Sequence, residues 1–117
     1  MKTYFFILDC TLPANQTYTG LDFIVPVNFQ WQKITGYDIS NFNPLIRISN
    51  ETQNYFYFND YIFFSNLIPR RPQGNTELLL PKFEILNIND TIKVEMKVSA
   101  SDINNRSIQL ILIGEKL

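Results

Sequence analysis

The sequence contains no histidine, and this absence removes most of the common catalytic and metal-binding chemistries. Without an imidazole there is no Ser-His-Asp or Cys-His arrangement. The single cysteine, Cys10, cannot form an intramolecular disulfide, and one thiol without histidine excludes an ordinary structural zinc site. The four glycines are too widely spaced to build a GxGxxG or GxxxxGK[ST] phosphate loop. We therefore expect a protein that is not an enzyme and has no cofactor.

Carboxylates are the reactive groups that remain, and paired carboxylates catalyse glycoside hydrolysis. The aspartates of this chain mostly stand beside turn-forming residues, where an aspartate bonds the local backbone. A calcium site at Asn89 and Asp90, or at Asp102 and Asn104, would need further oxygen ligands from separate loops. The turn interpretation is favoured, so we expect neither catalysis nor a bound metal.

The charge and the apolar runs exclude two further classes of partner. Ten basic and eleven acidic residues give a net charge of -1, which argues against nucleic-acid binding driven by phosphate neutralisation. The apolar run Tyr4–Leu8 is far shorter than the roughly 20 residues of a membrane-spanning helix and shorter than the core of a signal peptide. We expect that the protein is made in the cytoplasm and does not insert into a membrane.

Apolar residues alternate with polar ones along much of the chain, and amphipathic helical stretches are absent. No linker, repeat or charge block divides the 117 residues, so residues 1–117 form one domain. About eight strands, too closely spaced for crossover helices, predict an all-β antiparallel two-sheet sandwich or a barrel. Single strands are predicted at Thr3–Asp9, Leu21–Val27, Phe29–Asp38, Leu45–Ser49, Leu78–Leu86, 92–98 and Ser107–Ile113.

Residues 54–65 read as a tight β-hairpin with Asn59 and Asp60 at its turn, because both residue types tolerate positive φ. Simple alternation then places Phe56 and Phe58 on one face and Tyr55 and Tyr57 on the other.

Three other segments carry local expectations. Phe29, Trp31 and Lys33 are expected on one face of their strand, with a bulge or bend at Gly36. Ile68–Thr76 is expected to be an irregular loop, and Leu78–Leu86 a buried stretch kinked at its proline.

Two clusters are candidates for binding. The tyrosines of the 54–65 segment, together with Trp31, either form a flat platform for sugar rings or pack in the core or an oligomer interface. The loop Pro69–Gly74 presents two arginines that either pair with carboxylates of a neighbouring subunit or remain solvated. The candidate interface residues are therefore Trp31, Tyr55, Tyr57, Tyr61, Arg70 and Arg71.

In order along the chain, the predicted elements resemble those of small virion structural proteins of bacteriophages. The resemblance covers most of the chain but is one of pattern, without an invariant motif. It is carried by the turn Leu12–Asn15, the aromatic segment 29–36, Arg71-Pro72, Leu80–Phe83, and the closing Leu-Ile-Leu-Ile-Gly of Leu110–Gly114.

This resemblance implies a jelly-roll-like sandwich acting as a penton, spike-base, minor capsid or head-decoration subunit of a virion. The implied partners are further copies of the chain, as a trimer or pentamer, and a major capsid protein. Apolar residues on both faces of Leu110–Ile113 agree with self-association. The alternative is a carbohydrate- or receptor-binding module that uses the aromatic platform.

Overall fold

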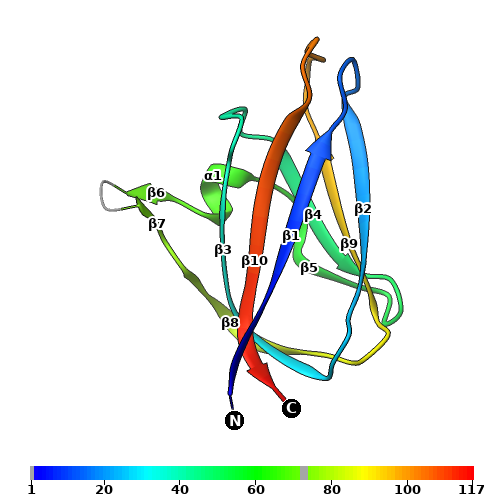
Figure 1. The fold of residues 1–117 in the computed structure, drawn as a ribbon, viewed down its shortest axis with the longest axis vertical. Coiled ribbons are helices and arrows are strands. Elements are labelled where there is room, and N and C mark those ends of the chain that lie inside the picture. The colour runs from blue at the N-terminus through cyan, green and yellow to red at the C-terminus, as the bar shows by residue number, and fades with distance from the viewer. Residues whose placement is uncertain (1, 72–73) are drawn as a thin grey trace.

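The computed structural model describes residues 2–71 and 74–117, with the backbone alone at residues 59, 70, 71, 74 and 75. Its long strands form two four-stranded antiparallel sheets that face each other (Figure 1). We call them the β1 sheet, ordered β1-β10-β3-β8, and the β2 sheet, ordered β2-β9-β4-β5. The elements are β1 (Thr3–Leu12), β2 (Tyr18–Ile24), β3 (Phe29–Tyr37), β4 (Leu45–Asn50), β5 (Tyr55–Phe63), α1 (Phe64–Leu67), β6 (Arg70–Arg71), β7 (Gly74–Asn75), β8 (Leu78–Leu86), β9 (Thr91–Lys97) and β10 (Arg106–Lys116).

The strand order is that of a jelly roll. When the short β6–β7 pair is set aside, the first four long strands pair with the last four in reverse order: β1 with β10, β2 with β9, β3 with β8 and β4 with β5. This is one long antiparallel hairpin rolled into two packed sheets. The predicted two-sheet sandwich is thereby confirmed, and the barrel alternative is wrong.

The core lies between the two sheets and follows the alternation of the strands. In β10, Ile108, Leu110 and Leu112 are buried while the residues between them are half-buried, because successive side chains point to opposite faces. Gly36 lies opposite Leu110, where a Cβ would stand 2.2 Å from the carbonyl oxygen of Gln109. The expected bulge at Gly36 is therefore wrong: the register is regular there, and glycine allows a close backbone approach.

The hairpin predicted over residues 54–65 is also wrong. This segment is the single strand β5, which pairs with β4 at both ends, from Asn50–Tyr55 to Leu45–Phe63. Residues 58–61 leave the ladder opposite Arg47, and Phe58 takes a φ of 57° at the start of this excursion. Because β4 offers a partner to both halves of the segment, the surplus residues bulge out without reversing the chain.

The expectation that Phe29, Trp31 and Lys33 share one face of β3 is wrong because of a register shift, and the expectation that Leu78–Leu86 is buried is wrong because that strand lies at an edge. Pairing with β10 and β8 skips Gln32, so Trp31 faces the core whereas Lys33 is paired on the outer face. The strand β8 is an edge strand, and most of it is exposed rather than buried. Residues 80–83, which include Pro81, leave the ladder with β3.

The segment Ile68–Thr76 is more regular than expected. Its backbone forms the two-residue ladder of β6 and β7, which projects sideways from the sandwich in Figure 1. Pro72 and Gln73 of the predicted arginine loop lie outside the described residues. The β2 strand begins and ends three residues earlier than predicted and stops before Pro26.

Candidate functional site

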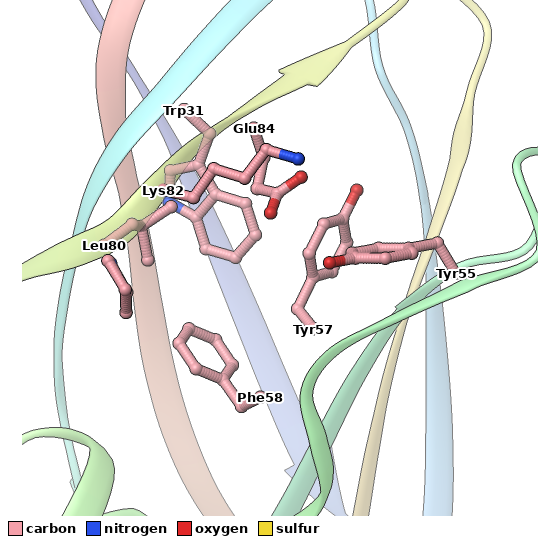
Figure 2. Close-up of a pocket in the computed structure, with 8 residues that line it drawn as sticks. Trp31, Tyr55, Tyr57, Phe58, Leu80, Lys82 and Glu84 are labelled. Atoms are coloured by element: carbon pink, nitrogen blue, oxygen red, sulfur yellow. The ribbon is translucent and has the colours of Figure 1, made fainter.

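A pocket of about 200 Å³ opens between the edge strands β5 and β8, one from each sheet (Figure 2). It lies where both strands leave their ladders, at residues 58–61 of β5 and residues 80–83 of β8. One wall carries aromatic side chains, and the other carries Leu80, Lys82 and Glu84 of β8. The two excursions thus open the side of the sandwich at one place.

The aromatic wall is a chain of edge-to-face contacts that runs from the floor of the pocket to its rim. The Trp31 ring lies 5.0 Å from the Tyr57 ring at an interplanar angle of 78°, and 6.1 Å from the Phe58 ring at 84°. Tyr57 in turn meets Tyr55 at 5.1 Å and 72°. Phe58 joins this cluster because its positive φ turns it away from Phe56. The prediction that Phe56 and Phe58 share a face is therefore wrong.

The aromatic residues of the pocket differ in burial, and only the exposed ones can contact a ligand. Trp31 is 0% exposed and its Nε1 donates to the carbonyl oxygen of Lys33 at 2.8 Å, whereas Tyr55 is 46% exposed. Burial raises the pKa of the Tyr57 hydroxyl to about 12, and this hydroxyl accepts a hydrogen bond from Asn50 at 3.4 Å. Of the two alternatives for Trp31, the flat platform is wrong, because the rings stand at steep angles and the indole is covered, and packing in the core is confirmed.

A second cluster occupies the outer face of the β2 sheet. Arg47 donates two hydrogen bonds to the carboxylate of Glu95, at 3.0 and 3.1 Å, and the same carboxylate accepts the hydroxyl of Tyr18 at 2.7 Å. The guanidinium lies between the rings of Phe56, at 5.2 Å, and Tyr61, at 4.5 Å. Burial acts to raise the pKa of Glu95, but the hydrogen bonds from Tyr18 and Arg47 outweigh it, and the net shift is downward.

These polar groups satisfy one another. The Lys97 ammonium sits over the Tyr61 ring at 4.1 Å, and Lys93 pairs with Glu51 at 3.4 Å. The centre of the outer face of the β2 sheet is therefore charged, and the Glu95 and Glu51 carboxylates there are already paired, while Ile24, Phe56 and Phe63 are exposed around it. Nothing in this arrangement frees a general acid or base.

The Asp90 carboxylate, a calcium candidate from the sequence, serves the backbone and neighbouring amides. Its Oδ2 accepts hydrogen bonds from Asn50, Gln53 and the backbone N–H of Asn87, at 2.9, 2.7 and 3.0 Å. Burial acts to raise its pKa, and the hydrogen bonds lower it on balance. Asp90 thus fastens the β8–β9 turn to the end of β4. The described residues hold no group of three His, Cys, Asp or Glu side chains placed to bind one metal ion.

The outer face of the β1 sheet is apolar by contrast. The registers align one row of side chains across all four strands of this sheet, and a second row of isoleucines lies beside it. In the first row Lys33 stands between Ile113 and Leu79, and we call the apolar exposed and half-exposed members of the two rows the outer apolar face. They are Phe5, Ile7, Leu79, Ile111 and Ile113.

The structure brings together some of the sequence-predicted residues and separates others. Trp31, Tyr55 and Tyr57 line the same pocket, whereas Tyr61 lies over Arg47 on the outer face of the β2 sheet. The side chains of Arg70 and Arg71 lie outside the described part of the chain. The sequence analysis pointed to the outer apolar face only through Leu110–Ile113, because this segment has apolar residues on both of its faces. The alternation of Phe5 and Ile7 with Phe6 and Leu8 carried the same signal.

No family model, no curated protein and no solved structure matches the chain. Within residues 2–71 and 74–117, no helix has the length and apolar character needed to cross a membrane.

Proposed function

We propose that the chain is a non-enzymatic structural subunit of a virus particle, which self-associates and contacts a major capsid protein. The observation that carries this proposal is the outer apolar face. Its contiguous part joins β1 and β10, where the exposed Phe5 and Ile7 lie beside Ile113 and Ile111, while Leu79 at the opposite edge is separated from them by Lys33. Contiguous exposed apolar surface on a soluble domain marks a surface that another protein covers.

The contrast between the two outer faces supports an assembly role. Charged side chains that pair with each other, such as Arg47 with Glu95, occupy the central strands of the β2 sheet, with exposed apolar residues such as Phe56 and Phe63 toward its edge. Covering the apolar residues of the β1 sheet lowers the free energy, because it removes apolar surface from water. Such a subunit would pack in an assembly with the apolar side of its β1 sheet against a neighbour.

The jelly-roll strand order supports the viral setting by fold-level analogy. Jelly rolls are the architecture of many capsid subunits, and also of lectin domains and cupins. Fold does not imply function, so this support is associational and the outer apolar face carries the physical argument. The sequence resemblance to small phage virion proteins also supports a role in a virus particle.

Mass spectrometry of particles purified from the source of the gene tests the proposal. We expect the chain at a defined ratio to the major capsid protein, and its absence from particles would overturn the proposal. Co-assembly with Ile113→Lys identifies the surface, because a lysine in the apolar row opposes burial of that face. The matched control is Asp22→Lys, at an exposed position of β2 on the other sheet, which we expect to co-assemble normally.

The pocket supports a second function, binding of a sugar or receptor group. Three of the predicted aromatic residues line it, and Lys82 and Glu84 provide polar groups opposite them. Tyr55→Ala is the test variant, because Tyr55 lines this pocket, and Phe56→Ala is its control, because Phe56 does not. The two neighbours are similarly exposed, at 46% and 47%, so the comparison separates loss of ligand binding from general effects of removing a surface aromatic residue. On a glycan array, we expect a signal that Tyr55→Ala abolishes and Phe56→Ala retains. Absence of any signal with the wild-type protein counts against this function.

A further inference from the structure

The four sheet edges differ in how they are protected against pairing with another strand. Natural edge strands are blunted by prolines, bulges, charges or short length. In β8, Pro81 lies in the segment that leaves the ladder, and in β5 residues 58–61 do the same. The edge strand β2 has seven residues, includes Gly20 and Asp22, and ends shortly before a proline.

The fourth edge, β1, has one of these devices along its length, the charge of Asp9 near its end. It has ten residues, and its register with β10 runs without a shift from Thr3–Glu115 to Leu12–Arg106. It contains no proline, and Asp9 is its only charged residue. A long, regular and largely apolar edge strand is a template for a further strand.

We propose that β1 pairs antiparallel with β1 of a second copy of this chain, so that the two β1 sheets continue into one another across a two-fold axis. The proposal rests on the self-association in the proposed function and specifies its surface. It replaces the trimer or pentamer that the resemblance implies with a two-fold contact. Such a contact is isologous, because the same strand serves both copies.

The alternation of β1 restricts the register of this pairing. Paired residues in an antiparallel ladder point to the same face, so the buried Phe6 and Leu8 must stay on the inner side. A two-fold axis at Phe6 sets Phe5 opposite Ile7 of the second copy, twice. An axis at Ile7 sets Phe5 opposite Asp9 of the second copy, which places a carboxylate against a phenyl ring. Packing therefore favours the axis at Phe6.

In this register the outer apolar faces of the two copies merge. Phe5 already lies beside Ile113, and Ile7 beside Ile111, within each copy. Pairing brings Phe5 and Ile7 of both copies together between these isoleucines, so the exposed phenyl and isoleucine side chains at the edge become the centre of a larger apolar band. The backbone groups on the free side of β1 gain hydrogen-bond partners at the same contact.

Sedimentation equilibrium on purified protein across the micromolar range tests the inference with Ile7→Lys and Leu79→Lys. Both residues belong to the outer apolar face and are similarly exposed, at 49% and 58%, but they lie on opposite edges of the sheet. We expect a wild-type dimer, a dissociation constant raised at least roughly tenfold by Ile7→Lys, and an unchanged dimer for Leu79→Lys. Circular dichroism on each variant confirms that it is folded.

Hydrogen exchange gives a second readout that needs no variant. Backbone amides of β1 should gain protection as the protein concentration rises, and those of β8 should not. A wild-type oligomer that Ile7→Lys leaves intact would overturn the inference while leaving self-association standing. A wild-type monomer throughout would also overturn it, and particle mass spectrometry would then decide the proposed function separately. Monomer with β1 protected only on adding capsid protein would assign the edge to a strand of that partner instead.

Discussion

Trp31 of the β1 sheet and Tyr57 of the β2 sheet meet edge to face across the core, with ring centroids 5.0 Å apart and an interplanar angle of 78°. The contact joins the two sheets beside the opening between β5 and β8. The indole, which the sequence left between a sugar platform and the core or an interface, therefore belongs to the framework of the pocket.

Trp31→Ala should destabilise the fold by about 3–5 kcal/mol, because it removes a large, fully buried side chain and its contacts with Tyr57 and Phe58. Urea unfolding followed by circular dichroism measures the loss. Tyr55→Ala, at the exposed end of the same aromatic chain, should cost less than about 1.5 kcal/mol. Equal losses for both variants would contradict the assignment of Trp31 to the core.

Gly36→Ala should destabilise the protein by about 1–3 kcal/mol, because the added Cβ would lie 2.2 Å from a backbone oxygen of the neighbouring strand. The matched substitution is Gly20→Ala, where the nearest atom is Cε of Lys93 at 3.1 Å, the movable end of a long side chain. We expect a change within about 0.5 kcal/mol there. Thermal melts of both variants make the comparison, and a neutral Gly36→Ala would refute the close approach.

Glu95→Gln should change how stability depends on pH. The folded state lowers the pKa of Glu95 below its ordinary value of 4.5, so the ionised carboxylate contributes stability above that value and loses it as the pH falls through the folded pKa. The wild-type advantage over Glu95→Gln should therefore be present at neutral pH and shrink as the pH falls below 4.5 and through the lowered pKa of the folded state. Urea midpoints across this range measure it, and a constant difference would contradict the argument.

Cys10 should be unreactive in the folded protein. Burial raises the pKa of its thiol to about 12, and the neighbouring charge of Asp9 adds to the shift. The thiolate is the reactive form, so a disulfide reagent at mildly alkaline pH should label Cys10 only after unfolding in urea. Rapid labelling without denaturant would show that β1 opens or that the thiol is exposed.

Thr3→Lys tests the register of the proposed dimer. With the two-fold axis at Phe6, residue 3 faces Asp9 of the second copy, so a lysine there should tighten the dimer by about 0.2–1 kcal/mol for each of the two symmetric pairs. Thr11→Lys adds the same charge to β1 but has no carboxylate opposite it in this register. Sedimentation equilibrium should show tighter association for Thr3→Lys alone, and the reverse result would move the axis.

The sequence predicted the strands well where one period-2 pattern persists. The alternation in residues 92–98 predicted β9, because one face of that strand must be buried and this sets the pattern locally, and the apolar run in Thr3–Asp9 predicted β1. The composition alone, with no histidine and one cysteine, likewise led us to expect neither imidazole-based catalysis nor a structural zinc site. The close strand spacing led to the sandwich, since it left no space for crossover helices.

The tertiary structure decided the site, because the site lies where strands leave their ladders. The skip at Gln32 reverses which side chains of β3 face inward, and the excursion of residues 58–61 sends Phe58 to the pocket and Tyr61 to the outer face of its own sheet. Such shifts depend on the length and pairing of neighbouring strands, which local alternation does not encode. The free edge at β1 was equally a matter of topology, since only the strand order leaves that apolar strand without a second neighbour.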